Sequence, residues 1–128
     1  MPEIEKRISS GSSFEALAAY SRAVVDDRYI YISGTVGIDP ETKTIPEDVA
    51  EQARNIFRIV EAVLADEAAT LAQVVRSRIY LTDAADLGAI LPVLAEKFGT
   101  CPPTNTTLIA GIPAPGAKIE IEITALRS

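Results

Sequence analysis

Residues 118–126, KIEIEITAL, alternate strictly between apolar and polar side chains. Successive side chains of a β-strand point to opposite faces, so this period of two predicts a strand with one apolar and one polar face. The apolar face carries Ile119, Ile121, Ile123 and Ala125, and the polar face carries Lys118, Glu120, Glu122 and Thr124. Helices are expected to cover the apolar face. The polar face is either a solvated surface or a surface that packs against another subunit and desolvates a carboxylate.

The sequence predicts two amphipathic helices that can cover the apolar face of this strand. Between residues 48 and 66, apolar side chains recur every three or four positions with polar residues between them, which is typical of a helix with one buried face. Asp48 and Glu51 resemble a capping box at its start. A second helix is predicted over residues 86–98, with a kink at Pro92, whose ring removes a main-chain hydrogen bond.

The N-terminal third of the chain predicts a hairpin. Residues 19–25 and 29–32 are rich in β-branched and aromatic side chains and flank an Asp-Asp turn. Ser33, Gly34 and Gly37 interrupt the extended segment that follows. Isolated glycines in strands typically mark a bulge or a close backbone approach.

Further strands are predicted over residues 74–81 and 104–110, with a Pro- and Gly-rich loop over 111–117. The expected order is therefore ββ(β)αβαββ, with six extended segments and two helices. This order predicts the α+β class, with both helices on one face of a six-stranded mixed sheet. The length of 128 residues fits one domain spanning residues 1–128.

The composition limits which partners and which catalytic groups the protein can use. The net charge of -6 has the wrong sign for a protein that binds phosphate backbones, so no nucleic-acid partner is expected. The chain has no histidine, which removes the commonest general base and the usual imidazole metal ligands. Catalysis would depend on carboxylates, Tyr, Lys, backbone groups or water, and no metal is expected.

The expected location is the cytoplasm. The single cysteine, Cys101, cannot form an internal disulfide, and the first ten residues lack the apolar core of a secretory signal. The longest uncharged stretch, residues 98–117, is interrupted by prolines and glycines and is not expected to cross a membrane.

Five segments in order resemble the RidA/YjgF family, formerly called endoribonuclease L-PSP: AYSRAV, YISGTVGIDP, DVAEQA, PPTNTTL and KIEIEITAL. The resemblance implies a chorismate-mutase-like fold and a homotrimer whose sheets face inward, with small-molecule clefts between neighbouring subunits. It also implies hydrolytic deamination of reactive enamines and imines such as 2-aminoacrylate, without metal or organic cofactor.

The resemblance also implies site residues. Tyr20 matches the family's cleft tyrosine, and Ser33 with Gly34 matches the step that brings backbone groups to the ligand. Glu120 matches the carboxylate that orients the attacking water or relays a proton, and it is the candidate catalytic residue.

One position departs from the family pattern. The family's deaminases carry Pro-Ala-Arg where this chain has Pro103-Thr104-Asn105, which places it in a subgroup lacking the substrate-anchoring arginine. That arginine forms a bidentate pair with the substrate carboxylate, whereas Asn105 offers hydrogen bonds without charge. Arg22, predicted on the same strand face as Tyr20, either supplies the missing cation or is a surface arginine.

Three functions follow, in order of preference. The first is hydrolysis of an enamine or imine other than 2-aminoacrylate, with Glu120 positioning water and the Ser33-Gly34 backbone and Asn105 fixing the substrate. The second is a non-catalytic ligand sensor that uses the same cleft. The third, an endoribonuclease, is disfavoured by the negative charge and the lack of histidine.

Overall fold

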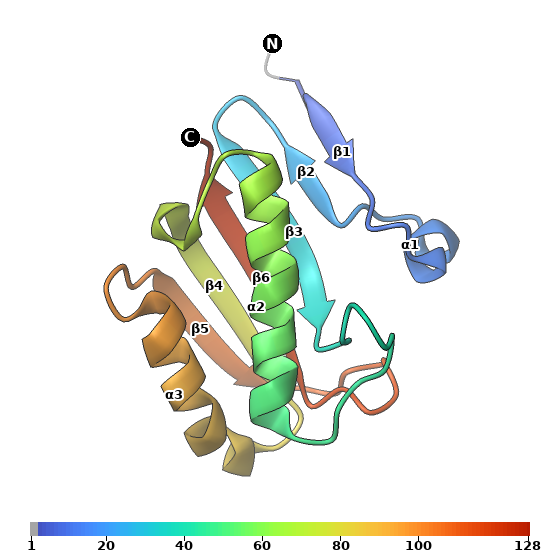
Figure 1. Ribbon diagram of the computed structural model, residues 1–128, viewed down its shortest axis with the longest axis vertical. Helices are drawn as coiled ribbons and strands as arrows, with labels where there is room; N and C mark the ends of the chain where they lie inside the picture. Colours follow the sequence, from blue (N-terminus) through green and yellow to red (C-terminus); the bar gives the residue numbers. More distant parts are fainter. Residues whose placement is uncertain (1–2) are drawn as a thin grey trace.

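Six strands form one mixed sheet in the order β1-β2-β3-β6-β4-β5 in the computed structural model, which describes residues 3–128 (Figure 1). Neighbouring strands are antiparallel except β4 and β5, which are parallel. The strands are β1 Lys6–Ile8, β2 Ala23–Val25, β3 Tyr29–Val36, β4 Val74–Leu81, β5 Thr104–Ile109 and β6 Ile119–Leu126.

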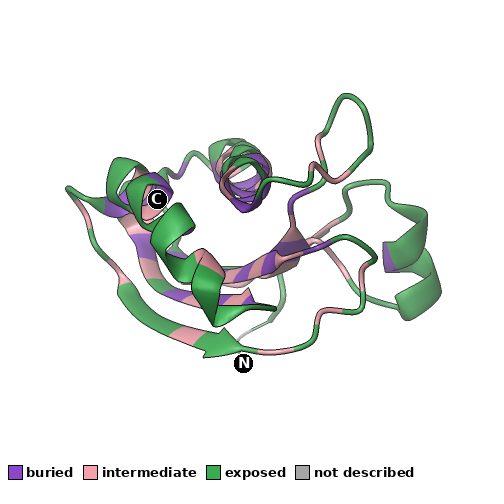
Figure 2. Ribbon diagram, turned by 90° about the horizontal axis from the view of Figure 1, so that it is seen from below, coloured by how far each residue is buried: buried purple, intermediate pink, exposed green. Residues whose placement is uncertain are grey.

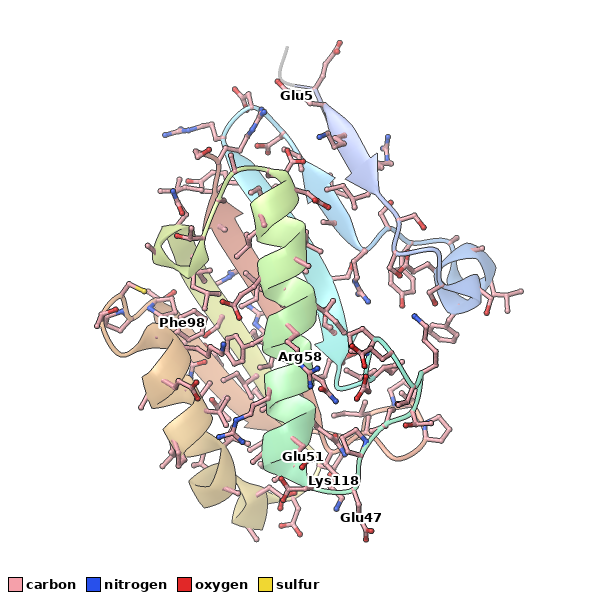
Figure 3. The ribbon with its side chains drawn as sticks, in the orientation of Figure 1. Glu5, Glu47, Glu51, Arg58, Phe98 and Lys118 are labelled. Atoms are coloured by element: carbon pink, nitrogen blue, oxygen red, sulfur yellow. The ribbon has the colours of Figure 1, made fainter. Side chains whose placement is uncertain are left out.

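The central strand is β6, which lies between β3 and β4. Its predicted alternation is confirmed, because every second residue from Ile119 to Ala125 is buried while Glu120 and Glu122 remain partly exposed on the other face. Lys118 precedes the strand and does not join this polar row. Its Nζ instead donates a 2.7 Å hydrogen bond to the carbonyl oxygen of Glu47, beside the start of the long helix (Figure 3).

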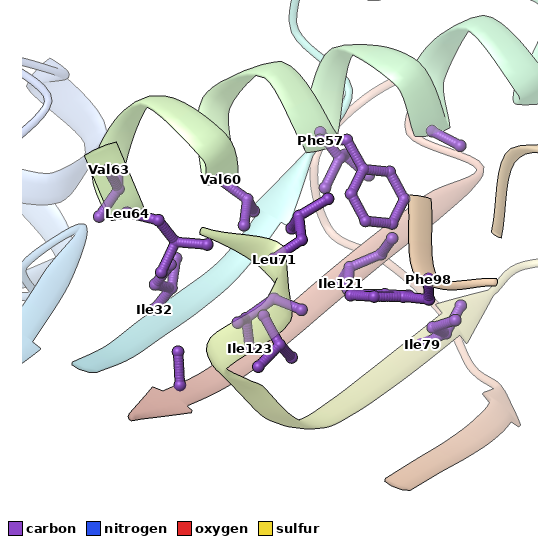
Figure 4. Packing of buried hydrophobic residues seen from close by; sticks show 14 of the residues in the cluster. Ile32, Phe57, Val60, Val63, Leu64, Leu71, Ile79, Phe98, Ile121 and Ile123 are labelled. Atoms are coloured by element: carbon purple, nitrogen blue, oxygen red, sulfur yellow. The ribbon is translucent and has the colours of Figure 1, made fainter. Parts of the chain in front are cut away.

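Two main helices, α2 (Val49–Asp66) and α3 (Leu87–Phe98), cover one face of the sheet. Figure 2 shows the buried side of α2 turned toward the strands. Phe57 of α2 meets Phe98 of α3 edge to face, with ring centroids 5.3 Å apart, above the isoleucines of the sheet (Figure 4). The α+β class with both helices on one face is therefore confirmed.

The start of α2 follows the sequence prediction. The Asp48 carboxylate accepts a hydrogen bond from the backbone N–H of Glu51 at 3.0 Å, which satisfies one of the free donors of the first helical turn. Pro92 lies inside α3, and a kink there stays a prediction.

The predicted strand over residues 19–25 is wrong in its first half. Residues Ser13–Ala18 form a short helix, α1, whose N-cap Ser12 accepts a hydrogen bond from the backbone N–H of Phe14. Ala19 ends α1 in the left-handed conformation with φ 61°, and β2 begins only at Ala23. The left-handed Ala19 turns the chain out of the helix, so residues 19–22 form a connection instead of the start of the strand.

The six extended segments are also divided differently from the prediction. The segment after residue 32 is not a separate strand, because β3 runs on to Val36 with a register shift between Ile32 and Thr35. The bulge therefore lies where the glycines predicted it. The sixth strand is β1, which was not predicted because it is a three-residue edge strand made largely of charged residues.

Candidate functional site

A pocket of about 410 Å³ opens on the face of the sheet opposite the two main helices. Its lining residues are Phe14, Tyr20, Ser33, Gly34, Tyr80, Glu120 and Glu122. The pocket brings together four of the residues selected from the sequence, namely Tyr20, Ser33, Gly34 and Glu120. Its size lies within the range of pockets that hold small metabolites.

The bulge in β3 shapes one wall of this pocket. Gly34 lies so close to Glu120 that a Cβ atom on it would come within 2.9 Å of the Glu120 side-chain carboxyl carbon. Ser33 is held from the other side, since its Oγ donates a 2.7 Å hydrogen bond to the Ser21 carbonyl and its N–H donates to the Arg22 carbonyl. Glycine at position 34 therefore lets the backbone approach the carboxylate.

Glu120 is the most perturbed acid in the pocket. Burial raises the pKa of Glu120, the charge of Arg22 opposes that shift, and the neighbouring Glu122 carboxylate reinforces it. No cation forms an ion pair with Glu120 within 4.0 Å among residues 3–128. A carboxylate with a raised pKa takes up a proton more readily than an ordinary one, which suits general acid–base chemistry.

The opposite wall comes from β4 and the next polar position of β6. Tyr80 pairs in register with Glu120, and its hydroxyl donates a 3.4 Å hydrogen bond to Oε1 of Glu122. Arg78 Nη1 lies 3.8 Å from the same Glu122 oxygen. Sequence analysis missed Tyr80 as a site residue, although an antiparallel β4–β6 register places it opposite Glu120.

Tyr20 enters the pocket from the connection between α1 and β2 rather than from a strand, which corrects its predicted placement. Its ring packs edge to face on Phe14 of α1, with centroids 6.2 Å apart. The α1 helix, which the sequence analysis did not predict, therefore contributes an aromatic ring to the pocket.

Arg22 lies behind the Gly34 wall and is not among the pocket-lining residues. Its side chain is only 11% exposed, so it is not a surface arginine. Nη2 donates a 2.7 Å hydrogen bond to the Gly34 carbonyl, Nη1 lies 4.0 Å from Glu15 Oε2, and the guanidinium carbon lies 5.6 Å from the centre of the Tyr20 ring. The same-strand relation predicted for Tyr20 and Arg22 is wrong, because both precede β2.

Glu15 is a buried carboxylate that the sequence analysis did not single out. It is 3% exposed and accepts hydrogen bonds from the hydroxyls of Ser9 and Ser10 and from the Ser10 N–H. Burial alone would raise the pKa of Glu15, but these hydrogen bonds and the charge of Arg22 outweigh it and the net shift is downward. Glu15 therefore stays ionised and balances the charge of Arg22.

Asn105 does not reach this pocket within the chain. It pairs with Ser77 across β5 and β4, and Ser77 is buried on the face that the helices cover. Ser77 Oγ donates a 3.0 Å hydrogen bond to Asn105 Oδ1, and Asn105 Nδ2 donates a 2.9 Å hydrogen bond to Thr107 Oγ1. Its amide is thus satisfied at the β5 edge of the sheet.

A second pocket, of about 300 Å³, lies on the other side of the molecule between residues 39–46 and α2. Two arginines and two carboxylates line it, among them Arg58 and Glu51 (Figure 3). None of the residues selected from the sequence contributes to it. Over residues 3–128, no group of three or more Cys, Asp or Glu side chains is placed to hold a metal ion, and no helix has the length and apolar character to cross a bilayer.

Comparison with known proteins points to one family. The sequence profile described as endoribonuclease L-PSP matches residues 10–127. A RutC family protein from Leuconostoc mesenteroides subsp. cremoris is 33% identical, with 96% of this chain and 98% of that protein covered. The 2-iminobutanoate/2-iminopropanoate deaminase of Rattus norvegicus is also 33% identical, covering 97% and 91%.

The fold has a close counterpart among solved structures. The crystal structure of a member of the YjgF/YER057c/UK114 family from Mycobacterium tuberculosis superposes with a TM-score of 0.84 at 35% sequence identity. The superposition covers 98% of this chain and 99% of the other. The two proteins therefore share the same fold over nearly their whole length.

Proposed function

Because the chain belongs to the endoribonuclease L-PSP family, also known as RidA/YjgF, we propose that it hydrolyses an enamine or imine other than 2-aminoacrylate in the pocket around Glu120. The observation that carries this proposal is the partly buried Glu120 beside the Gly34 backbone, which forms no ion pair with any residue that the structure describes. Relatives named 2-iminobutanoate/2-iminopropanoate deaminase support the reaction class.

In the proposed reaction, Glu120 accepts a proton from a water molecule that attacks the carbon of the C=N bond. That proton passes to nitrogen and gives a tetrahedral carbinolamine. Glu120 then transfers the hydroxyl proton of the carbinolamine to the same nitrogen as the C=O bond forms and the C–N bond breaks, so that the products are ammonia and a ketone or aldehyde. Tyr20, Ser33 and Gly34 hold the substrate against Glu120. No cofactor takes part in this scheme.

We further propose a homotrimer that closes the pocket. The polar face of the sheet also carries exposed apolar side chains in register with it, which favours an interface over a solvated surface. These are Tyr31, Leu108 and Leu126, exposed by 42%, 47% and 40%. Asn105 lies on the face that the helices cover, but it is exposed on the edge strand β5. We propose that in such an assembly it reaches the pocket of a neighbouring subunit across this edge.

Imines generated in place by amino-acid oxidases test the deaminase proposal. We expect the wild type to accelerate release of ammonia and the oxo product over spontaneous hydrolysis, and Glu120→Gln to lose this acceleration. Glu96→Gln, which removes an exposed carboxylate from α3, is the matched control and should behave like the wild type.

The other two functions give different results in the same experiment. Binding of imines or their products with no acceleration by the wild type would support the ligand sensor and contradict the deaminase. An endoribonuclease would instead cleave RNA in a manner that Glu120→Ala abolishes, although a pocket with two carboxylates opposes binding of a polyphosphate chain.

A further inference from the structure

We infer that the pocket around Glu120 selects a planar cation, namely the iminium ion formed when an amine-derived imine without a carboxylate is protonated. This inference rests on the proposed function, because it names the substrate class of the same site. It departs from the anionic 2-imino acids in the names of the related deaminases.

The charge of the pocket lining carries the inference. This chain contributes seven residues to the pocket lining, and two of them, Glu120 and Glu122, are carboxylates. Within the part of the chain that the structure describes no Lys or Arg lines the pocket, and Asn105, the residue proposed to come from a neighbouring subunit, is uncharged. Among residues 3–128, Glu120 also has no ion-pair partner. An anionic substrate would meet like charge at short range, whereas a cation would supply the missing partner.

The nearest cations lie against groups of this chain. Arg22 donates to the Gly34 carbonyl behind the wall and lies 4.0 Å from the ionised Glu15, which offsets part of its charge, while its buried Nε has no hydrogen-bond partner among residues 3–128. Arg78 lies beside Glu122 and offsets that carboxylate rather than leaving a free guanidinium for a substrate. Neither arginine is placed to form the bidentate pair that holds a carboxylate.

The aromatic lining favours the same kind of ligand. Phe14, Tyr20 and Tyr80 line the pocket together with the two carboxylates, and the Tyr20 ring already accepts one cation, since the Arg22 guanidinium lies 5.6 Å from its centre. The faces of aromatic rings attract cations, and this attraction strengthens where water is excluded. A flat iminium can lie against a ring while its N–H groups donate to Glu120.

The reaction balances without a further reactant. One iminium ion and one water molecule give one carbonyl compound and one ammonium ion: the C=N bond breaks, a C=O bond forms, and both water protons end on nitrogen. Glu120 takes one of these protons during attack and returns it to the leaving nitrogen, so it ends in its starting state.

Binding of three stable probes of similar shape tests the charge preference directly. Benzamidinium is a planar cation, benzamide is its neutral counterpart and benzoate is the anion. We expect isothermal titration calorimetry at low salt to show benzamidinium binding at least about tenfold more tightly than benzoate, with benzamide between them. Equal binding, or tighter binding of benzoate, would overturn the inference.

Replacing a carboxylate of the pocket tests whether the preference for a cation arises in the pocket. Glu122→Gln removes one lining carboxylate and should reduce the advantage of benzamidinium over benzoate, while Glu96→Gln on α3 should leave it unchanged. If both variants keep the wild-type preference, the cation binds elsewhere and the inference fails.

Turnover of two matched imines separates this inference from the proposed function. An amine oxidase acting on propylamine yields an imine that differs from 2-iminobutanoate only in lacking the carboxylate. We expect the wild type to favour the propylamine product in kcat/KM by at least about tenfold. Acceleration of 2-iminobutanoate alone overturns the charge preference but keeps the deaminase. Tight benzamidinium binding with neither imine accelerated keeps the charge preference but contradicts the deaminase.

Discussion

Arg22 donates a 2.7 Å hydrogen bond to the carbonyl oxygen of Gly34, and Gly34 in turn lies against the carboxylate of Glu120. The buried arginine thus holds the pocket wall from behind while its charge acts on the acid in front. Glu15, fixed by the hydroxyls of Ser9 and Ser10, holds the arginine from the far side. A segment that precedes the first long strand therefore controls the geometry around Glu120.

Removing the charge of Arg22 should shift the pH profile of turnover. Glu120 accepts protons only when ionised, and Arg22 lowers its pKa against the effect of burial. In Arg22→Gln the pKa of Glu120 should rise further above 4.5, so the acidic limb of kcat/KM should move to higher pH. Arg22→Lys keeps the charge and should move the limb less. An unchanged limb in Arg22→Gln, measured beside Arg28→Gln as control, would show that Arg22 does not act on Glu120.

Two glycine substitutions should separate an effect on turnover from an effect on thermal stability. A Cβ at position 34 meets only the flexible end of Glu120, so Gly34→Ala should displace that carboxylate and reduce turnover with little change in Tm. A Cβ at position 37 meets the backbone of Gln52 in α2 at 2.5 Å, so Gly37→Ala should lower Tm substantially. Thermal denaturation and turnover measured on both variants check the contrast. Loss of stability in Gly34→Ala with turnover retained would contradict it.

Glu15 should stabilise the fold in a pH-dependent way. Its folded pKa lies below 4.5, so its contribution is present above that value and is lost as pH falls through the folded pKa. Glu15→Gln should lower the free energy of unfolding at pH 7 by about 1 to 3 kcal/mol. In urea titrations the difference from the wild type should shrink at acidic pH. A difference independent of pH would assign the loss to packing instead of charge.

The oligomeric state tests the interface proposed for the uncovered sheet face. Light scattering coupled to size exclusion should give about three times the chain mass of 13.7 kDa. Leu108→Lys introduces a charge on that face and should shift the distribution toward smaller species. A monomer at micromolar concentration would contradict the trimer and the shared pocket.

Periodic segments were predictable from the sequence because one local rule governs each of them. The alternation of β6 and the three-to-four spacing of α2 are such cases, and both elements lie where they were expected. The N-terminal segment was not predictable in this way. Glu15 is buried where Ser9, Ser10 and Arg22 contact it, and such contacts between separate segments leave no periodic pattern in the sequence.

Some residues of the candidate site could likewise be predicted from the sequence, whereas others required the three-dimensional structure. Glu120 stood out as a carboxylate in a polar row, and Tyr20, Ser33 and Gly34 came from the family resemblance. Tyr80 required the register between β4 and β6, which becomes known only once the sheet order is known. The parity of β5 likewise sets Asn105 on the face of Ser77, away from the pocket of its own chain.

The position of β6 also governs how the protein folds. Of the six strands, β6 is the last along the chain, yet it separates β3 from β4. The β2–β3 hairpin and the β4–α3–β5 crossover unit can form as soon as they are synthesised, but their facing edges stay unpaired until residues 119–126 emerge. Those open edges are competent to pair with other nascent chains, so the interval before β6 inserts is when this protein is most exposed to aggregation.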